Sequence, residues 1–206
     1  MKTIGSIVLA FFALVVGLAF LVLISVWTAY NGLNRGLQAS NARWADVEGA
    51  YQRRYDLIPN LVETVKGVAN FEKETLTGVV TARASVGQIK MTSAPGSEAD
   101  IQKFAAAQQG LGTALSRLLV VSENYPQLKA TDSFRDLQAQ IEGTENRINV
   151  ARRDYNKAVE DYNYLRETIT GSLARNFKPF DPKPYFKVQD EAATAAPKVT
   201  FTTPAK

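Results

Sequence analysis

The chain has 206 residues, 46% of them hydrophobic, and carries 24 basic and 20 acidic side chains for a net charge of +4. It contains no cysteine and no histidine, which excludes disulfides, thiolate metal sites and nucleophile systems built on Cys–His or Ser–His–Asp. This mildly basic balance falls well short of a nucleic-acid-binding surface, so we expect no nucleic-acid partner.

The first 30 residues differ in composition from the rest. Residues 4–24 are almost wholly apolar, and about 20 such residues span a bilayer as a helix. Trp27 and Tyr30 follow, where interfacial aromatic side chains anchor a spanning helix. A secretory signal peptide is the alternative, but the apolar run is too long and no A-x-A-like site follows it. We expect a retained transmembrane anchor over residues 1–30, with residues 4–26 in contact with membrane lipid.

The body is expected to be helical over residues 31–174. It begins with a polar, glycine-bearing junction at residues 31–36. After this junction, apolar side chains return at steps of three and four, beginning at Trp44 and Val47. This spacing is typical of an amphipathic helix.

The segment "RRYDLIPNLVETVKG", residues 53–67, places a proline inside this helical pattern. Pro59 cannot donate a hydrogen bond to the carbonyl of Tyr55, and its ring crowds the preceding turn. We therefore expect a helix kink at Pro59, with Asn60 or a neighbouring arginine binding the freed carbonyl. A hinge or a notch in which a partner docks is the functional alternative.

The next two helices are delimited by turn and capping signals. A corner is expected near Asn70, which can cap the second helix, and residues 91–100 form a loop. Ser97 and Asp100 resemble a capping box that opens the third helix, and Pro126 stops it. The predicted buried face of the third helix is Ile101, Phe104, Gln108, Leu111, Leu115, Leu118, Ser122 and Tyr125.

The last helix has the longest unbroken heptad pattern, and Asp132 or Ser133 is expected to cap it. Its predicted face is Phe134, Leu137, Ile141, Thr144, Ile148, Ala151, Tyr155, Ala158, Tyr162, Leu165 and Ile169. A 3.5-residue period sustained this long indicates closely aligned helices with a left-handed twist. With short connections, the predicted fold is all-α: an N-terminal transmembrane helix followed by an up-and-down four-helix bundle.

The chain changes character again after residue 174. Residues 175–187, "RNFKPFDPKPYFK", mix basic, aromatic and proline residues and are expected to form an extended strap. Residues 188–206 have the composition of a disordered, low-complexity tail. If the last helix returns toward the bilayer, the strap lies near the headgroups. The candidate lipid contacts are Arg166, Arg175, Lys178, Lys183 and Lys187. The alternative is a strap that packs on the bundle itself or on a neighbouring subunit.

Two arginine pairs are the most distinctive polar clusters of the body. They are Arg53 and Arg54 in "RRYD", and Arg152 and Arg153 in "RRDYN". We regard them as candidate contacts for an anion or a partner protein, and interhelical ion pairs with Asp56, Asp154 and Glu63 are the alternative. A di-iron centre in a bundle needs Glu-x-x-His pairs, so we expect no metal and no cofactor. No nucleophile–base pair is evident, and we expect no enzymatic activity.

Several segments resemble the LemA family of bacterial membrane proteins in order and spacing. They include "RRYDLIPNLVETVKG", "EGTENRINVARRDYN" and "FKPFDPKPYFK". The resemblance covers about residues 30–187 and implies a membrane helix and a four-helix body, with no catalytic residue, cofactor or substrate. Phe71 stands where the family often has a histidine. Residues 167–174 replace the family's Phe-Pro, which allows the last helix to run further here.

From these features we expect a membrane-anchored helical scaffold or interaction protein of the bacterial cell envelope. It would cross the cytoplasmic (inner) membrane once, and the short N-terminus favours a body on the extracytoplasmic side. Its expected partners are copies of itself or another envelope protein. Ala13-x-x-x-Gly17 and Gly32-x-x-x-Gly36 indicate self-association. A lipid-surface or membrane-shaping module and a small-ligand sensory bundle acting through a partner are the alternatives.

Overall fold

The computed structural model describes residues 2–68, 70–89 and 94–187, and within these ranges it contains six helices and no strand. The helices are α1 (Lys2–Lys66), α2 (Lys73–Gly87), α3 (Glu98–Ser122), α4 (Pro126–Lys129), α5 (Asp132–Glu167) and α6 (Ile169–Ala174). The all-α prediction is confirmed for the described residues. The predicted tail, residues 188–206, lies outside them.

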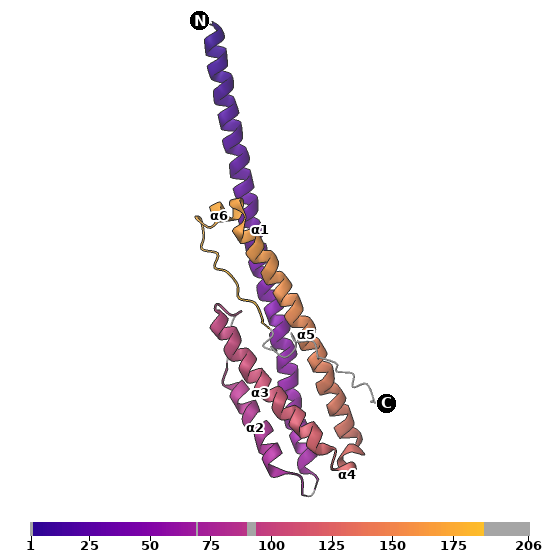
Figure 1. The fold of residues 1–206 in the computed structure, drawn as a ribbon. Coiled ribbons are helices and arrows are strands. Elements are labelled where there is room, and N and C mark those ends of the chain that lie inside the picture. Colours follow the sequence, from indigo (N-terminus) through magenta and orange to yellow (C-terminus); the bar gives the residue numbers. More distant parts are fainter. Residues whose placement is uncertain (1, 69, 90–93, 188–206) are drawn as a thin grey trace, which may run out of the picture.

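α1 is a single helix of 65 residues, about 98 Å long at 1.5 Å per residue. The predicted junction at residues 31–36 is therefore wrong, because the helix continues from its apolar end into the body (Figure 1). The glycines of this stretch make room for α5. A Cβ on Gly32 would lie 2.8 Å from Leu165 Cδ2, and one on Gly36 would lie 3.3 Å from Tyr162 Cδ2. Packing against α5 thus outweighs the weak helix propensity of glycine.

The long helices alternate in direction along the chain (Figure 1). α1 descends from the N-terminus, α2 returns, α3 descends again and α5 rises along α1. α2 and α3 have 15 and 25 residues, whereas α5 has 36. The two shorter helices therefore cover only the lower part of the rod that α1 and α5 form. We refer to the part nearer the corner between α1 and α2 as the distal half and to the part nearer the N-terminus, which α3 reaches only with its first turns, as the proximal half.

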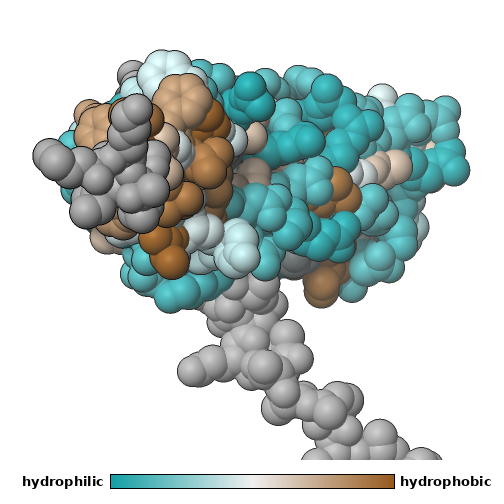
Figure 2. Space-filling view, turned by 90° about the horizontal axis from the view of Figure 1, so that it is seen from above, coloured by the Kyte–Doolittle hydropathy of each residue, from teal (hydrophilic) through white to brown (hydrophobic). Residues whose placement is uncertain are grey.

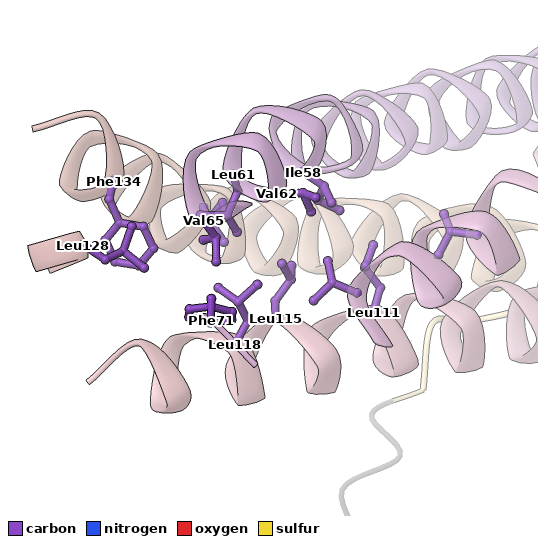
Figure 3. Close-up of a cluster of buried hydrophobic side chains, with 13 residues drawn as sticks. Ile58, Leu61, Val62, Val65, Phe71, Leu111, Leu115, Leu118, Leu128 and Phe134 are labelled. Atoms are coloured by element: carbon purple, nitrogen blue, oxygen red, sulfur yellow. The ribbon is translucent and has the colours of Figure 1, made fainter. Parts of the chain in front are cut away.

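The distal half is filled by aliphatic side chains and two phenylalanines from α1 to α5 (Figure 3). This distal core consists of Ile58, Leu61, Val62, Val65, Phe71, Val79, Val86, Leu111, Leu115, Leu118, Leu128, Phe134 and Ile141. All predicted positions of α3 from Ile101 to Ser122 are buried, and Tyr125 is half-buried. The three–four periodicity of α3 therefore identified its buried face correctly.

The corner between α1 and α2 lies at Asn70, as predicted, but Asn70 does not cap α2. Its φ of 63° is in the left-handed region, which asparagine tolerates better than most residues, and Glu72 precedes α2 instead. The carbonyl of Asn70 accepts a hydrogen bond from Tyr125 Oη at 3.0 Å. Asn70 therefore makes the corner through its backbone conformation.

The starts of α3 and α5 are set by different capping residues. Ser97 Oγ accepts a hydrogen bond from the amide of Asp100 at 3.2 Å, as the predicted capping box requires. Thr131 occupies the cap position of α5, so the prediction of Asp132 or Ser133 is wrong by one or two residues. Asp132 lies in the first turn instead, where its negative charge interacts favourably with the helix dipole.

α5 ends at Glu167, and the prediction that its pattern reaches Ile169 is wrong. Thr168 is extended and caps α6, because its Oγ1 accepts a hydrogen bond from Gly171 N at 3.1 Å. A Cβ on Gly171 would overlap the carbonyl oxygen of Leu165, so glycine permits this tight reversal. Ile169 consequently leaves the core and is 83% exposed. The last helix does not run further at residues 167–174.

The strap doubles back along α5, and residues 179–187 have no regular secondary structure. Two asparagines of α5 each bind one strap residue twice. Asn163 Nδ2 donates to the carbonyl of Lys183 at 2.8 Å, and Asn163 Oδ1 accepts from its amide at 2.9 Å. Asn156 makes the same two hydrogen bonds with Phe186, at 2.9 and 2.8 Å. The strap is therefore held through its backbone.

Two tyrosines of α5 repeat this register. Tyr162 Oη donates to the carbonyl of Asp181 at 2.9 Å, and Tyr155 Oη donates to that of Pro184 at 3.0 Å. In both pairs, contacts seven residues apart on α5 are three residues apart on the strap. Seven helical residues rise about 10.5 Å, and three extended residues span about 9–10 Å. A heptad helix and an extended chain can therefore stay in register along their length.

The proximal half is packed mainly with aromatic side chains and small aliphatic ones. This proximal core consists of Val26, Ala29, Leu33, Trp44, Val47, Tyr51, Ile101, Phe104, Ile148, Ala151, Tyr155, Val159, Tyr162, Ala174, Phe180 and Phe186. Trp44 stacks on Phe186 at 6.1 Å between ring centroids and meets Tyr155 edge-on at 5.4 Å. Residues 179–187 thus pack on the bundle's own side, which was the alternative arrangement for the strap.

Candidate functional site

A pocket of about 450 Å³ opens between α1, α3 and α5 where the strap ends. We refer to it as the arginine pocket. Its polar lining comes from α1, α3, α5 and the strap, and includes Tyr51, Arg54, Gln108, Glu145, Arg152 and Lys187. The other polar lining residues are Gln109, Thr113, Ser116 and Asn149.

Arg54 forms the inner wall of the pocket. It is three residues beyond Tyr51 and four before Ile58, so it lies on the buried face of α1 and is only 5% exposed. Its guanidinium forms an ion pair with the carboxylate of Glu145 on α5. A Cβ on Gly112 of α3 would lie 3.1 Å from Arg54 Nη2, so the glycine leaves room for the guanidinium. Pairing offsets the cost of burying this charge.

Arg152 forms the outer wall of the pocket and is half-buried. Its guanidinium lies 4.5 Å from the centroid of the Phe186 ring, and its Nη2 donates to the carbonyl of Lys187 at 3.4 Å. Among the described residues Arg152 has no carboxylate partner, whereas Lys187 forms an ion pair with Glu98. The strap therefore orients Arg152 while leaving its charge uncompensated.

The interior of the pocket has unused hydrogen-bonding capacity. Within the described ranges, Arg54 Nε and Gln108 Oε1 are buried and have no hydrogen-bond partner. Burial raises the pKa of Tyr51, while the charges of Arg152 and Arg54 lower it to a smaller extent. The Tyr51 hydroxyl therefore stays protonated at neutral pH and can donate. Donors and positive charge together suit a carboxylate, which guanidinium groups bind with two parallel hydrogen bonds.

The structure brings together one member of each predicted arginine pair. Arg54 and Arg152 line the arginine pocket, whereas Arg53 and Arg153 are exposed outside it. Neighbouring residues on a helix point about 100° apart, so both members of a pair could not face one pocket. The ion-pair alternative holds for Arg54, but its partner is Glu145 and none of the three predicted carboxylates. Glu145 was missed because it lies on another helix, far along the chain.

Gln108 could have been found from the sequence. It is the one amide side chain in the predicted buried series of α3, and it is 5% exposed in the structure. A polar residue in a buried series needs a partner or a role. Phe186, by contrast, carried no such signal, because an extended strap has no periodicity that shows which side chain is buried.

Three of the predicted lipid contacts lie against the bundle. Arg166 Nε donates to the carbonyl of Phe180 at 2.7 Å. Lys183 is half-buried beside α5, and burial lowers its pKa. Lys187 lies beside the arginine pocket and pairs with Glu98. These contacts are within the chain, so lipid binding by these residues stays a prediction.

The other two predicted lipid contacts lie at the proximal end of the body. Arg175 directly follows α6, and its Nη2 donates to Ser172 Oγ at 3.2 Å. Lys178 is exposed, and its Nζ donates to Asn34 Oδ1 at 3.0 Å. Their contact with lipid is also a prediction that the structure leaves open to experiment.

Pro59 lies inside α1, and the structure provides a donor for the carbonyl it frees. Arg83 Nε of α2 donates to the carbonyl of Tyr55 at 3.4 Å, and its guanidinium lies 3.9 Å from the centroid of the Tyr55 ring. The donor is thus an arginine, which was one of the two predicted donors, and it comes from another helix. The kink itself stays a prediction.

The fold and the arginine pocket define a helical protein with a polar pocket between its long helices. By length and composition, the N-terminal part of α1 is able to cross a membrane. In the part of the chain that the structure describes, no group of three or more acidic side chains could hold a metal ion.

The sequence pattern that defines the LemA family matches residues 43–201, and the chain belongs to this family. Two curated relatives, the magnetosome proteins MamQ 1 and MamQ 2 of Paramagnetospirillum magneticum, are each 39% identical to the chain over 57 residues. Each match covers 28% of this chain and 21% of the relative, so the chain spans about a fifth of these relatives' length.

Proposed function

We propose that this chain is a membrane-anchored helical scaffold of the cell envelope that binds a partner protein through the arginine pocket. The observation that carries the proposal is the unbroken α1, which links the apolar N-terminal segment to the pocket. Arg54 lies 28 residues beyond residue 26, which is about 42 Å along a helix. Such a rod would hold the pocket at a fixed distance from the membrane.

The chemistry of the pocket favours an acidic side chain of the partner as the occupant. Arg152 supplies an uncompensated charge at the rim, and Arg54 Nε supplies an unpaired buried donor inside, as far as the described residues extend. A carboxylate would pair with the guanidinium of Arg152 and accept a hydrogen bond from Tyr51. The partner is a second copy of the chain or another envelope protein, and the body lies on the extracytoplasmic side. The proposal assigns the chain no catalytic activity.

The test is a mass measurement of the full-length protein in mild detergent, with identification of any co-purifying protein. The variant is Arg152→Glu, which reverses the charge at the rim of the pocket. Arg153→Glu is the matched control, because it makes the same charge change one residue away and outside the pocket. Circular dichroism of both variants checks that the helices are intact.

We expect the unsubstituted protein to exceed its monomer mass of 22.6 kDa, through self-association or a stoichiometric partner. Arg152→Glu should release the partner, and Arg153→Glu should retain it. A monomer without a stoichiometric partner would contradict the scaffold. Equal loss in both variants would show that general charge, and not the arginine pocket, holds the partner.

A further inference from the structure

α6 and the turn after it expose large apolar side chains at the proximal end of the body. Ile169 is 83% exposed, Leu173 42% and Phe177 75%. Ile169 and Leu173 share one face of α6, and Phe177 follows at the same step of four residues. The buried residues of α6 are the small ones, Gly171 and Ala174. This is the reverse of an ordinary surface helix, whose large apolar side chains face the core.

These side chains adjoin the exposed apolar surface of α1. Trp27 of α1 is 68% exposed. Its ring and that of Phe177 help to line an apolar pocket of about 600 Å³. The remaining lining residues are Leu23, Ile24, Val26 and Tyr30. Figure 2, which looks down on the N-terminal end, shows apolar surface gathered on one side of the view, while most of the rest of this face is hydrophilic. We refer to Trp27, Ile169, Leu173 and Phe177 as the apolar collar.

The height of the apolar collar matches the expected edge of a bilayer. Residues 4–26 form about 34 Å of helix, compared with a hydrocarbon core about 30 Å thick. Trp27 comes directly after this segment, where interfacial aromatic side chains are enriched. Large apolar side chains on a short helix at the same level are typical of an element that lies in the interface plane.

We propose that the apolar collar is buried in the lipid interface and forms a second attachment of the body to the membrane. This inference rests on the proposed membrane anchor and goes beyond the scaffold function. A spanning helix by itself leaves the body free to tilt relative to the membrane. A second attachment beside the helix axis limits this tilt and sets which face of the rod leans toward the membrane. Because the collar attaches through apolar side chains, it does not require anionic lipid.

The test uses the full chain reconstituted in lipid vesicles. Since the chain has no cysteine, single-cysteine variants accept one nitroxide label each. Ile169→Cys and Phe177→Cys place labels on the apolar collar, and Leu14→Cys places one on the spanning segment. Val120→Cys is the matched control, because Val120 is a similarly exposed apolar residue, at 69%, in the distal half. Label collisions with oxygen, which concentrates in lipid, are compared with collisions with a water-soluble nickel chelate.

We expect oxygen collisions to exceed nickel collisions at Ile169, Phe177 and Leu14, and the reverse at Val120. The result should be the same in neutral and anionic vesicles. If Ile169 and Phe177 behave like Val120 while Leu14 reports lipid, the anchor holds and the collar proposal is overturned. If the collar labels are shielded from both reagents, a protein surface covers them, and the proposal is overturned in favour of an interface. If Leu14 itself reports water, the membrane anchor fails.

Discussion

The two halves of the body are stabilised in different ways, although α1 and α5 run through both. In the distal half, α2, α3 and α4 complete a core of aliphatic side chains. In the proximal half, the strap takes the place of α2, packs beside the first turns of α3, and brings two phenylalanines, Phe180 and Phe186, into an aromatic core. Helices pack there against an extended chain, which presents its backbone as well as its side chains.

The difference shows what one heptad helix needs from each kind of partner. A helical neighbour satisfies its own backbone, so α5 meets it with apolar side chains such as Phe134 and Ile141. An extended neighbour leaves its amides and carbonyls unpaired, so α5 must supply hydrogen bonds. Asn156 and Asn163 each satisfy one donor and one acceptor. The side chains of α5 therefore change character where its partner changes.

If the distal half depends on apolar packing, a cavity there should have the largest effect. Leu115 is 2% exposed in the distal core. Leu115→Ala should lower the free energy of unfolding by about 2–5 kcal/mol, because buried methyl groups are lost and a cavity remains. Urea unfolding in detergent, followed by helical circular dichroism, measures this change. Val120→Ala on the exposed face of α3 should change it by less than about 0.5 kcal/mol. Equal effects would contradict the assigned buried face.

The proximal half should show a stability loss at alkaline pH. Burial raises the pKa of Tyr155 from 10.0 to about 12. Below pH 10 the hydroxyl is protonated in both states, and stability is fully present. Between pH 10 and 12 the unfolded state loses the proton first, so the free energy of unfolding falls by about 1.4 kcal/mol per pH unit, or roughly 2–3 kcal/mol in total. Burial raises the pKa of Tyr51 and Tyr162 as well, in the same direction.

The measurement is urea unfolding at a series of pH values from 9 to 12. Tyr155→Phe removes the ionising group and should flatten part of the fall, at the cost of the hydrogen bond to Pro184. A stability that stays constant across this range in the unsubstituted protein would show that Tyr155 is accessible to water, and thus that the strap does not cover it.

Loss of a strap contact should have a smaller, local effect. Asn163→Ala removes two hydrogen bonds to Lys183 and leaves two backbone groups of the strap unpaired. We expect a destabilisation of about 1–3 kcal/mol. Hydrogen exchange of the Lys183 amide should become faster, while α1 to α3 stay protected. Gln140→Ala, at an exposed position of α5, is the control. Faster exchange throughout the chain would indicate that the strap is part of the global folding unit.

The sequence was informative where contacts repeat along a helix. The buried face of α3 follows directly from its spacing, and the corner at Asn70 follows from length and turn chemistry. The apolar pattern did not identify Arg54 as a buried residue, although helical phase between Tyr51 and Ile58 places it on the buried face. A charged residue can be predicted to be buried only when its partner, here Glu145, is known to lie opposite it.

Contacts between distant segments could not be predicted from the sequence. Gly32 and Gly36 have the composition of a junction, and only the approach of α5 explains why the helix continues through them. The path of the strap also depends on distant contacts, because its hydrogen bonds to α5 join residues 14 to 35 positions apart. An extended chain has backbone groups at every residue, so composition alone does not select its binding face.

The smallest expected effect concerns Pro59, which lies in α1 beside the distal core. Pro59→Ala should change the free energy of unfolding by about 1 kcal/mol or less, because a helical amide is restored while the unfolded chain gains freedom. In the unsubstituted protein the carbonyl of Tyr55 depends on Arg83. Arg83→Ala should therefore cost about 1–3 kcal/mol, the penalty for an unpaired group in a partly buried site.

The two changes should be coupled, since both act on the carbonyl of Tyr55. In the Pro59→Ala background, the restored amide at position 59 can donate to that carbonyl, so Arg83→Ala should cost less by about 0.5 kcal/mol or more. A double-mutant cycle of urea unfolding measures this coupling, with Arg117→Ala, an exposed arginine on α3, as the control. Full additivity would show that Arg83 acts only through the Tyr55 ring. Loss of a bound partner in Pro59→Ala, with helicity intact, would instead identify Pro59 as a docking notch.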